Sequence, residues 1–190
     1  MDINKVLKKQ KKSYNRFMLF MGFIFVCLPI ILFYFKRFSP FFILYLVVTE
    51  LLVLQAALIR RNEEYLTFEQ VDDKIVIEVG LIKLRYSIIA KKVAIVHTIN
   101  NKDNFDIIVV TKGRFRNKRL KHVDFKFLQK QHTISRYYNR VRLKNDDPYF
   151  YFIIRKGGAK KYLLLNFLYK LCVNSAFTDS AIEIIKKYRT

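Results

Sequence analysis

Two apolar segments near the N-terminus limit what this chain can fold into. Residues 17–35 carry no charge, and residues 38–59 carry a single one, at Glu50. The hydrocarbon core of a bilayer is about 30 Å thick and takes roughly 20 helical residues to cross, so each segment is long enough to span it. Because only Lys36 and Arg37 separate the two segments, the sequence predicts a transmembrane helical hairpin over residues 17–59.

A signal peptide and a pair of buried core helices are the alternatives to this hairpin. A signal peptide has an apolar core of about 7 to 15 residues, followed by small residues at its cleavage site. The first segment is longer and ends in Phe33, Tyr34 and Phe35. Both segments are also apolar on every helical face, which favours membrane spans over two helices buried in a core.

The basic residues around the two segments predict their orientation. Six cations precede the first segment and Arg60 and Arg61 follow the second, whereas only Lys36 and Arg37 lie between them. An excess of Lys and Arg marks the cytoplasmic side of a membrane protein, and the reverse topology would export a strongly basic domain. We therefore expect a multi-pass protein of the cell membrane with both termini in the cytoplasm. The expected parts are a basic cytoplasmic tail (1–16), the hairpin (17–35 and 38–59) and a cytoplasmic domain (60–190).

The expected cytoplasmic domain is strongly basic. The net charge of the chain is +21, and residues 60–190 hold 28 Lys and Arg against 13 Asp and Glu. This length suits one domain with a real core rather than two domains. The two cysteines, Cys27 and Cys172, form neither a disulfide framework nor a metal-binding pattern, and they suit a reducing compartment.

The domain shows mainly the period-two alternation of β-strands. The expected strands cover residues 65–70, 74–79, 81–88, 93–99, 105–111, 122–128, 140–144, 149–155 and 162–165, the last of them after a hairpin turn at 156–160. At the end of the chain Ala181, Ile184, Ile185 and Tyr188 recur with helical spacing. The sequence therefore predicts a mainly-β barrel or sandwich closed by a C-terminal amphipathic helix.

Residues 66–86 show a specific order of elements. A strand (LTFEQ) leads into a turn with two Asp residues, a second strand (KIVIEV) ends at Gly80, and a third strand carries basic residues. With the hairpin before it, this order resembles the bacterial pleckstrin-homology-like domains that follow a two-helix membrane anchor. The resemblance implies a pleckstrin-homology-like fold and a binding or scaffolding role, and some such proteins are small membrane proteins of bacteriocin-immunity type. Phosphoinositide binding is not implied, because bacteria generally lack those lipids.

Motifs for catalysis and cofactor binding are weak. The chain has five Gly, and none of them belongs to a phosphate-binding Gly-rich loop. His97, His122 and His132 lack the spacing of a metal-binding helix, and each is expected at the surface or at a strand edge. The acidic pairs at 72–73 and 146–147 are typical of turns. We therefore predict that the protein is not an enzyme and binds neither a metal nor a cofactor.

Residues 112–144 form the most basic part of the domain, with twelve Lys and Arg and one acid, Asp124. This segment has three interpretations: a solvated face, a patch for anionic lipid headgroups, or a nucleic-acid surface with aromatic stacking. Phe125 and Phe127 alternate with polar residues like core positions of a strand, which favours burial of these rings over stacking. The candidate surface residues are Arg114, Arg116, Lys118, Arg119, Lys121, Arg140 and Arg142.

Glu50 is the intramembrane polar candidate. It lies near the middle of the second expected span, where an ionisable side chain is costly and indicates a function. One interpretation is a polar contact between helices or between protomers, with Thr49 and Gln55 as neighbours. The other is an ion or proton pathway, although the two spans hold no second charge for a relay.

Together these features predict a membrane-anchored, non-enzymatic binding or scaffolding protein that presents a basic cytoplasmic domain at the anionic membrane surface. The expected partners are anionic lipid headgroups, together with a protein partner or a second copy of the chain. Two alternatives stay open. The first is a bacteriocin-immunity or stress-type protein that acts through its hairpin, and the second is a membrane-tethered nucleic-acid-binding protein.

Overall fold

The computed structural model describes residues 3–36, 39–101, 104–114, 117, 119–142 and 148–189, with the backbone alone at 101, 142, 188 and 189. The chain divides into two compact units. Residues 4–63 form the first unit, and the second is built from residue 64 onward.

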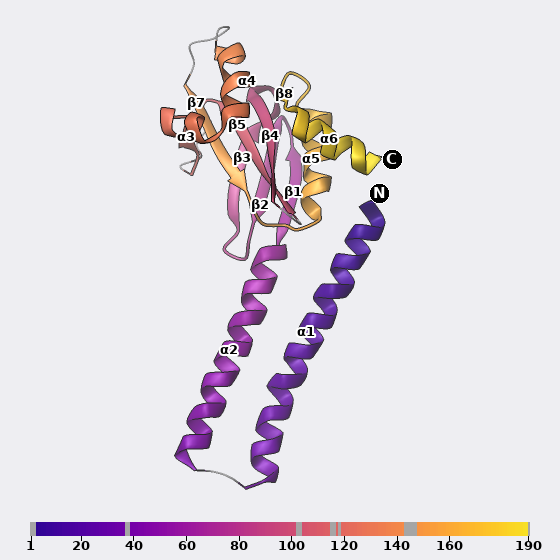
Figure 1. The fold of residues 1–190 in the computed structure, drawn as a ribbon, viewed down its shortest axis with the longest axis vertical. Coiled ribbons are helices and arrows are strands. Elements are labelled where there is room, and N and C mark those ends of the chain that lie inside the picture. The colour runs from indigo at the N-terminus through magenta and orange to yellow at the C-terminus, as the bar shows by residue number, and fades with distance from the viewer. Residues whose placement is uncertain are drawn as a thin grey trace. The chain divides into compact units, whose positions relative to one another are not determined.

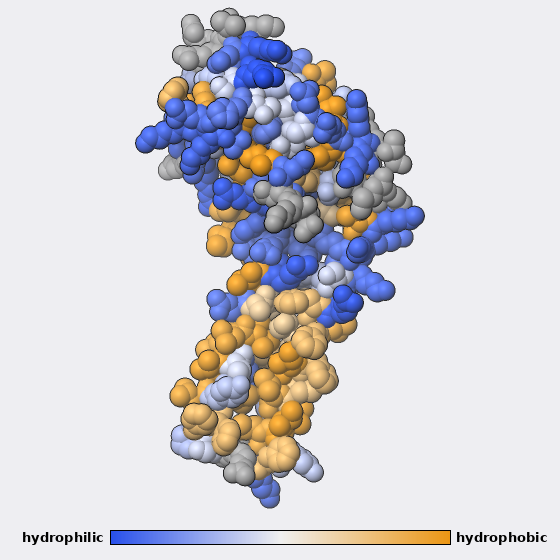
Figure 2. All heavy atoms as spheres, in the orientation of Figure 1, coloured by the Kyte–Doolittle hydropathy of each residue, from blue (hydrophilic) through white to orange (hydrophobic). Residues whose placement is uncertain are grey.

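The first unit is a pair of long helices, α1 (Ile3–Tyr34) and α2 (Pro40–Glu64). Neither helix has a buried side chain, and their surfaces carry mainly apolar residues, drawn in orange in Figure 2. Both helices are long and apolar enough to cross a membrane. The basic residues of the expected tail (1–16) are part of the first helix, because α1 begins at Ile3.

The second unit begins with a three-stranded antiparallel sheet in the order β1-β2-β3 (Figure 1). Its strands are β1 (Leu66–Val71), β2 (Lys74–Val79) and β3 (Leu84–Ile89). Leu66 pairs with Val79, which in turn pairs with Leu84. Asp72 has a φ of 54° between β1 and β2, a left-handed conformation that Asp tolerates in tight turns.

The second sheet has five strands in the order β6-β7-β5-β4-β8. They are β4 (Val93–Asn101), β5 (Asn104–Lys112), β6 (Lys121–His122), β7 (Tyr149–Ile154) and β8 (Ala176–Phe177), and the 3₁₀ turn η1 (Ala90–Lys92) precedes them. The pairing is antiparallel except between β4 and β8. In the described part of the chain both sheets are open, so the domain is a mixed helix and sheet fold in which no barrel closes.

Three of the expected strands are wrong, because helices occupy their places. The helices of the domain are α3 (Phe125–Lys130), α4 (His132–Arg142), α5 (Lys160–Leu171) and α6 (Asp179–Arg189). The strand expected at 122–128 turns into α3 because the Asp124 side chain accepts the Phe127 N–H (2.9 Å) and caps the helix. The strand expected at 140–144 runs into the end of α4, and its residues 143–144 lie outside the described part. The strand expected at 162–165 lies within α5.

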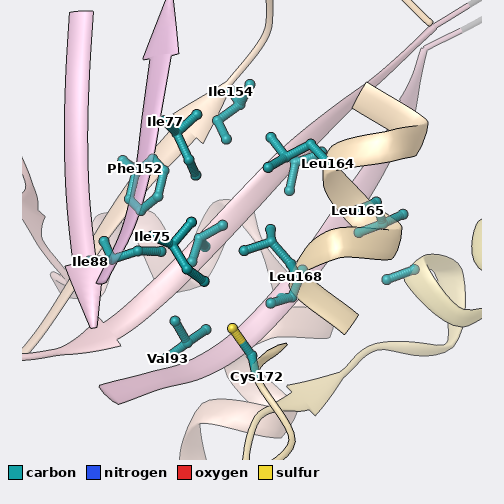
Figure 3. Close-up of a cluster of buried hydrophobic side chains, with 14 of the residues drawn as sticks. Ile75, Ile77, Ile88, Val93, Phe152, Ile154, Leu164, Leu165, Leu168 and Cys172 are labelled. Carbon is teal, nitrogen blue, oxygen red and sulfur yellow. The ribbon is translucent and has the colours of Figure 1, made fainter. Parts of the chain in front are cut away.

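The five-stranded sheet is buried on both faces, which gives the domain three layers. In β5, Ile107 and Val109 face the three-stranded sheet, α5 and α6, whereas Ile108 and Val110 face α3 and α4. Figure 3 shows the first of these cores, where leucines of α5 meet apolar residues of the strands and Cys172. The expected C-terminal helix is confirmed as α6. Its Ala181, Ile184 and Ile185 are buried in the same core.

Candidate functional site

A cavity of about 260 Å³ opens in the domain where the edge strand β3 approaches β6 and β7. One part of its lining is apolar or aromatic and comes from both sheets: Val79, Leu84, Tyr86 and Phe152. The other part is cationic: Arg119, Lys121, Arg155 and Lys156. A site that combines apolar walls with a few charged groups has the chemistry of a ligand pocket.

The apolar part of the cavity is built by a contact between the two sheets. The ring of Tyr86 in β3 stacks on the ring of Phe152 in β7, with centroids 4.5 Å apart and planes at 15°. Phe152 is buried, and Tyr86 is half-buried beside it. Offset stacking of this kind adds about 1 kcal/mol beyond the burial of the rings. The stack therefore fixes the distance between β3 and β7 and keeps an apolar wall at the cavity.

The cations of the cavity come from two segments that are far apart in sequence. Lys121 lies in β6, opposite Tyr151 of β7. Arg119 lies in the loop before β6, where the buried Asn117 accepts the Arg119 N–H through its Oδ1 atom (3.2 Å). Arg155 and Lys156 directly follow β7. The pairing of β6 with β7 thus brings both basic pairs to one cavity.

A buried lysine holds the segment that carries Arg155. Lys161 of α5 is fully buried, and its Nζ atom donates to the Arg155 carbonyl (2.8 Å) and to the Phe105 carbonyl. Burial lowers the pKa of Lys161 to about 8, and the nearby Asp106 carboxylate partly opposes this shift. Asp106 also lies 3.9 Å from the Arg155 Nε atom, but that guanidinium is largely exposed. The exposed Arg155 charge therefore stays available to solvent and to a ligand, since such pairs are weak.

The candidate cations of the basic segment lie at different places in the structure. Arg119 and Lys121 lie at the cavity. Arg114 lies in the loop after β5, with its Nε atom donating to the Asn117 carbonyl (3.2 Å). Arg140 lies in α4, 6.0 Å from the Tyr137 ring centre. Arg116, Lys118 and the side chain of Arg142 lie outside the described part.

Sequence reasoning missed Arg155 and Lys156. These residues fall outside residues 112–144, where cations are densest along the chain. The only available signal was their place at the end of the expected strand 149–155, because a strand end brings charged residues to the rim of a sheet. The pairing partner of that strand decides which other cations they meet, and sequence spacing does not give it.

Two further residues singled out by the sequence are His97 and Glu50, and neither lies at the cavity. His97 is expected at the surface or at a strand edge, but it is buried in β4, where its Nδ1 atom lies 2.9 Å from the Thr178 Oγ1 atom, and burial lowers the pKa of its ring. Glu50 is half-buried in α2, and its Oε1 atom has no hydrogen-bond partner among the described residues. The neighbouring Thr49 hydroxyl donates to the Tyr45 and Leu46 carbonyls of its own helix.

In the described ranges, no group of three or more His, Cys, Asp or Glu side chains is arranged to hold a metal ion. Comparison with known proteins adds no relative: no protein-family model matches the chain, and neither a curated protein nor a solved structure matches it. Its function therefore has to be argued from the cavity and the two apolar helices.

Proposed function

We propose that the protein is a membrane-anchored, non-enzymatic binding protein whose basic domain holds anionic groups at the cytoplasmic membrane surface. The observation that carries this proposal is the gathering of four cations around one cavity of the domain, from two segments of the chain. Arg119, Lys121 and Arg155 are exposed, and the ion pair of Arg155 with Asp106, at 3.9 Å, is largely solvated, so these charges act mainly on the surroundings.

The anchor in this proposal is the pair α1 and α2. Both are long and apolar enough to span a bilayer, and the cations before the first and after the second favour a cytoplasmic position for both termini. In this arrangement the chain enters the domain from the membrane at Tyr65, directly before β1.

The cavity lies at the end of the three-stranded sheet where the chain enters. Leu66, the first residue of β1, pairs with Val79, and Val79 pairs with Leu84, so these residues share one end of the sheet. Val79 and Leu84 both line the cavity. The Gly80 N–H also donates to the Tyr65 carbonyl (2.9 Å) and closes this end. The cavity cations, which belong to β6, β7 and their flanking residues, thus lie beside the end of the three-stranded sheet at which the chain enters the domain.

The four cations of the cavity are enough to bind the domain measurably to an anionic membrane surface. Each Lys or Arg near an anionic leaflet contributes about 1 kcal/mol, so four together supply about 4 kcal/mol, roughly a thousandfold in an equilibrium constant. This attraction falls off within a Debye length, about 8 Å at physiological ionic strength. Binding of this kind therefore depends on the anionic lipid content and on salt.

We also propose that the domain is a diverged pleckstrin-homology-like domain. The features that support this are the antiparallel order β1-β2-β3 with an Asp turn between β1 and β2, and the packing of α6 on the core. Of the aromatic rings in the basic segment, Phe127 and Tyr138 are buried and unavailable for stacking, whereas Phe125, which the alternation predicts to be buried, is exposed because it begins α3 instead of continuing a strand. Nucleic-acid binding therefore has less support than lipid binding.

Hydrogen–deuterium exchange of the full chain in lipid nanodiscs tests the binding function. We expect slower exchange in segments 119–122 and 153–156 when phosphatidylcholine is supplemented with about 30 mol% phosphatidylglycerol, because the anionic surface engages the cavity cations. About 1 M salt should reverse the effect, since it shortens the Debye length to about 3 Å.

The double variant Arg119→Gln with Lys121→Gln should lose most of this protection. Its matched control, Lys126→Gln with Arg136→Gln, removes the same charge from exposed positions of α3 and α4 and should keep it. Equal exchange in neutral and anionic discs would contradict the proposed function. Equal loss in the two variants would show that net charge, rather than the cavity, drives binding.

A further inference from the structure

We infer that the cavity between β3 and the β6–β7 pair binds a small amphipathic anion, with an apolar ring against the cavity wall and a phosphate or carboxylate at its cations. This inference rests on the proposed binding function and names the ligand class of the same site. The electrostatic attraction of a lipid surface needs cations only, whereas this site offers cations beside an apolar wall.

The apolar residues of the lining contact the ring of the ligand, and the cations contact its charged group. Leu84 is half-buried at the cavity, and water on its apolar surface is released when an apolar group replaces it, whereas Val79 and Phe152 are almost fully buried in the wall. Inorganic phosphate has no apolar part and gains nothing from this wall. A ligand with one ring gains from it, because it also meets the aromatic side chain of Tyr86.

The size of the cavity limits the ligand. Its volume of about 260 Å³ is below the usual range for drug-sized ligands, roughly 300 to 1,000 Å³. A single ring with one charged group suits this space, whereas a dinucleotide or a diacyl lipid would leave most of its bulk outside. A lipid therefore satisfies the site only through its headgroup region.

The cations favour an anion with several oxygen acceptors. Arg119 and Arg155 bring planar guanidinium groups with parallel donors, and Lys121 and Lys156 add ammonium groups. The Asp106 carboxylate lies 3.9 Å from the Arg155 Nε atom and contributes one negative charge beside these four cations. An arriving phosphate or carboxylate therefore meets a surplus of positive charge.

Isothermal titration of the full chain in phosphatidylcholine nanodiscs tests this site with three probes. We expect phenyl phosphate to bind at least about tenfold more tightly than inorganic phosphate, because the ring adds burial worth that factor. Benzyl alcohol, which has the ring but no charge, should bind at least about tenfold more weakly than phenyl phosphate, because it lacks the charge-assisted bonds.

Variants connect the binding to the cavity. Arg119→Gln with Lys121→Gln should weaken phenyl phosphate about tenfold or more, and the control pair Lys126→Gln with Arg136→Gln should leave its affinity unchanged. Tyr86→Ala should weaken phenyl phosphate but not inorganic phosphate, and Tyr86→Phe should preserve both affinities because the stack on Phe152 stays.

The outcomes separate this inference from the proposed function. Absence of phenyl phosphate binding, or equal affinity for phenyl and inorganic phosphate, overturns the amphipathic-anion site even where anionic discs protect the domain from exchange. Phenyl phosphate binding that the cavity variants abolish supports the site even where anionic lipid gives no protection. Competition by phosphatidylglycerol discs would identify a lipid headgroup as the source of the anion, and undiminished binding in those discs would identify a soluble one.

Discussion

Single residues of the core also position residues of the cavity in this domain. Lys161 shows this most clearly, because a lysine in the apolar stripe of α5 holds two backbone carbonyls at strand ends. One of those carbonyls belongs to Arg155, so the burial of one cation positions another at the cavity. A buried charge of this kind costs free energy that its hydrogen bonds only partly offset.

Lys161 gives the domain a specific dependence of stability on pH. Its pKa is lowered to about 8 in the folded chain from 10.5, mainly by burial, so between these values the unfolded chain binds more protons. Stability therefore rises with pH across this window, and the rise attributable to Lys161 is on the order of 3 kcal/mol. In Lys161→Met this rise should be missing. Thermal unfolding of both full-length proteins in neutral detergent, followed by near-ultraviolet circular dichroism from pH 7 to pH 10, measures the difference. Parallel pH curves would show that Lys161 does not titrate as argued.

Gly157 lies where an added side chain would clash with Leu66. Its φ is +114°, and a Cβ atom there would lie 2.5 Å from the Leu66 Cδ2 atom. Gly157→Ala should therefore combine backbone strain with a clash at the start of β1 and lower the free energy of unfolding by about 2 to 4 kcal/mol.

Gly113→Ala is the matched control for this substitution. Its φ is +84°, but a Cβ atom there meets nothing within 4 Å, so only the backbone strain remains, about 1 kcal/mol. The melting temperatures of the two variants should differ clearly, with Gly157→Ala lower. Equal melting temperatures would mean that Leu66 moves aside without cost.

At the scale of elements, the sequence predicts what depends on local order and misses what depends on burial from two sides. The strands expected from 65 to 111 are confirmed as elements, because alternation and turn residues specify them locally. The strand expected at 81–88 begins only at Leu84, because residues 81–83 form a turn in which Lys83 has a φ of 47°. The unbroken apolar runs at 93–96 and 107–110 indicate strands covered on both faces; α3 and α4 cover one face, and the three-stranded sheet with α5 and α6 covers the other. Such runs predict cover on both faces of a sheet, but they do not say which segments provide it.

The helix α5 was missed for a different physical reason. Its buried positions Lys161, Leu164, Leu165 and Leu168 have helical spacing, but a lysine at the first of them hides the stripe. The helix α3 has an Asp cap but only six residues, which is too short for a periodic pattern. The cavity depends on the pairing of β6 with β7, a contact between distant segments that no local pattern reports.

At the scale of the whole molecule, the proposed function needs a membrane hairpin followed by a domain that binds anions at the cytoplasmic surface. In this proposal the apolar helices would supply the anchor, and the cations of the cavity would supply the attraction. Both parts depend on one property, the side of the membrane on which the domain lies. A domain on the outer side would meet neither the anionic cytoplasmic leaflet nor the soluble anions of the cytoplasm.

Cysteine accessibility in intact cells tests this property directly. Single cysteines replace Ser39, next to the turn between α1 and α2, and Asn100, an exposed residue near the end of β4, in a chain without Cys27 and Cys172. The account predicts that a membrane-impermeant maleimide labels position 39 in intact cells and labels position 100 only after the membrane is permeabilised, because the basic flanks keep the domain inside. Labelling of position 100 in intact cells, with position 39 protected, would contradict the cytoplasmic orientation and the proposed function with it.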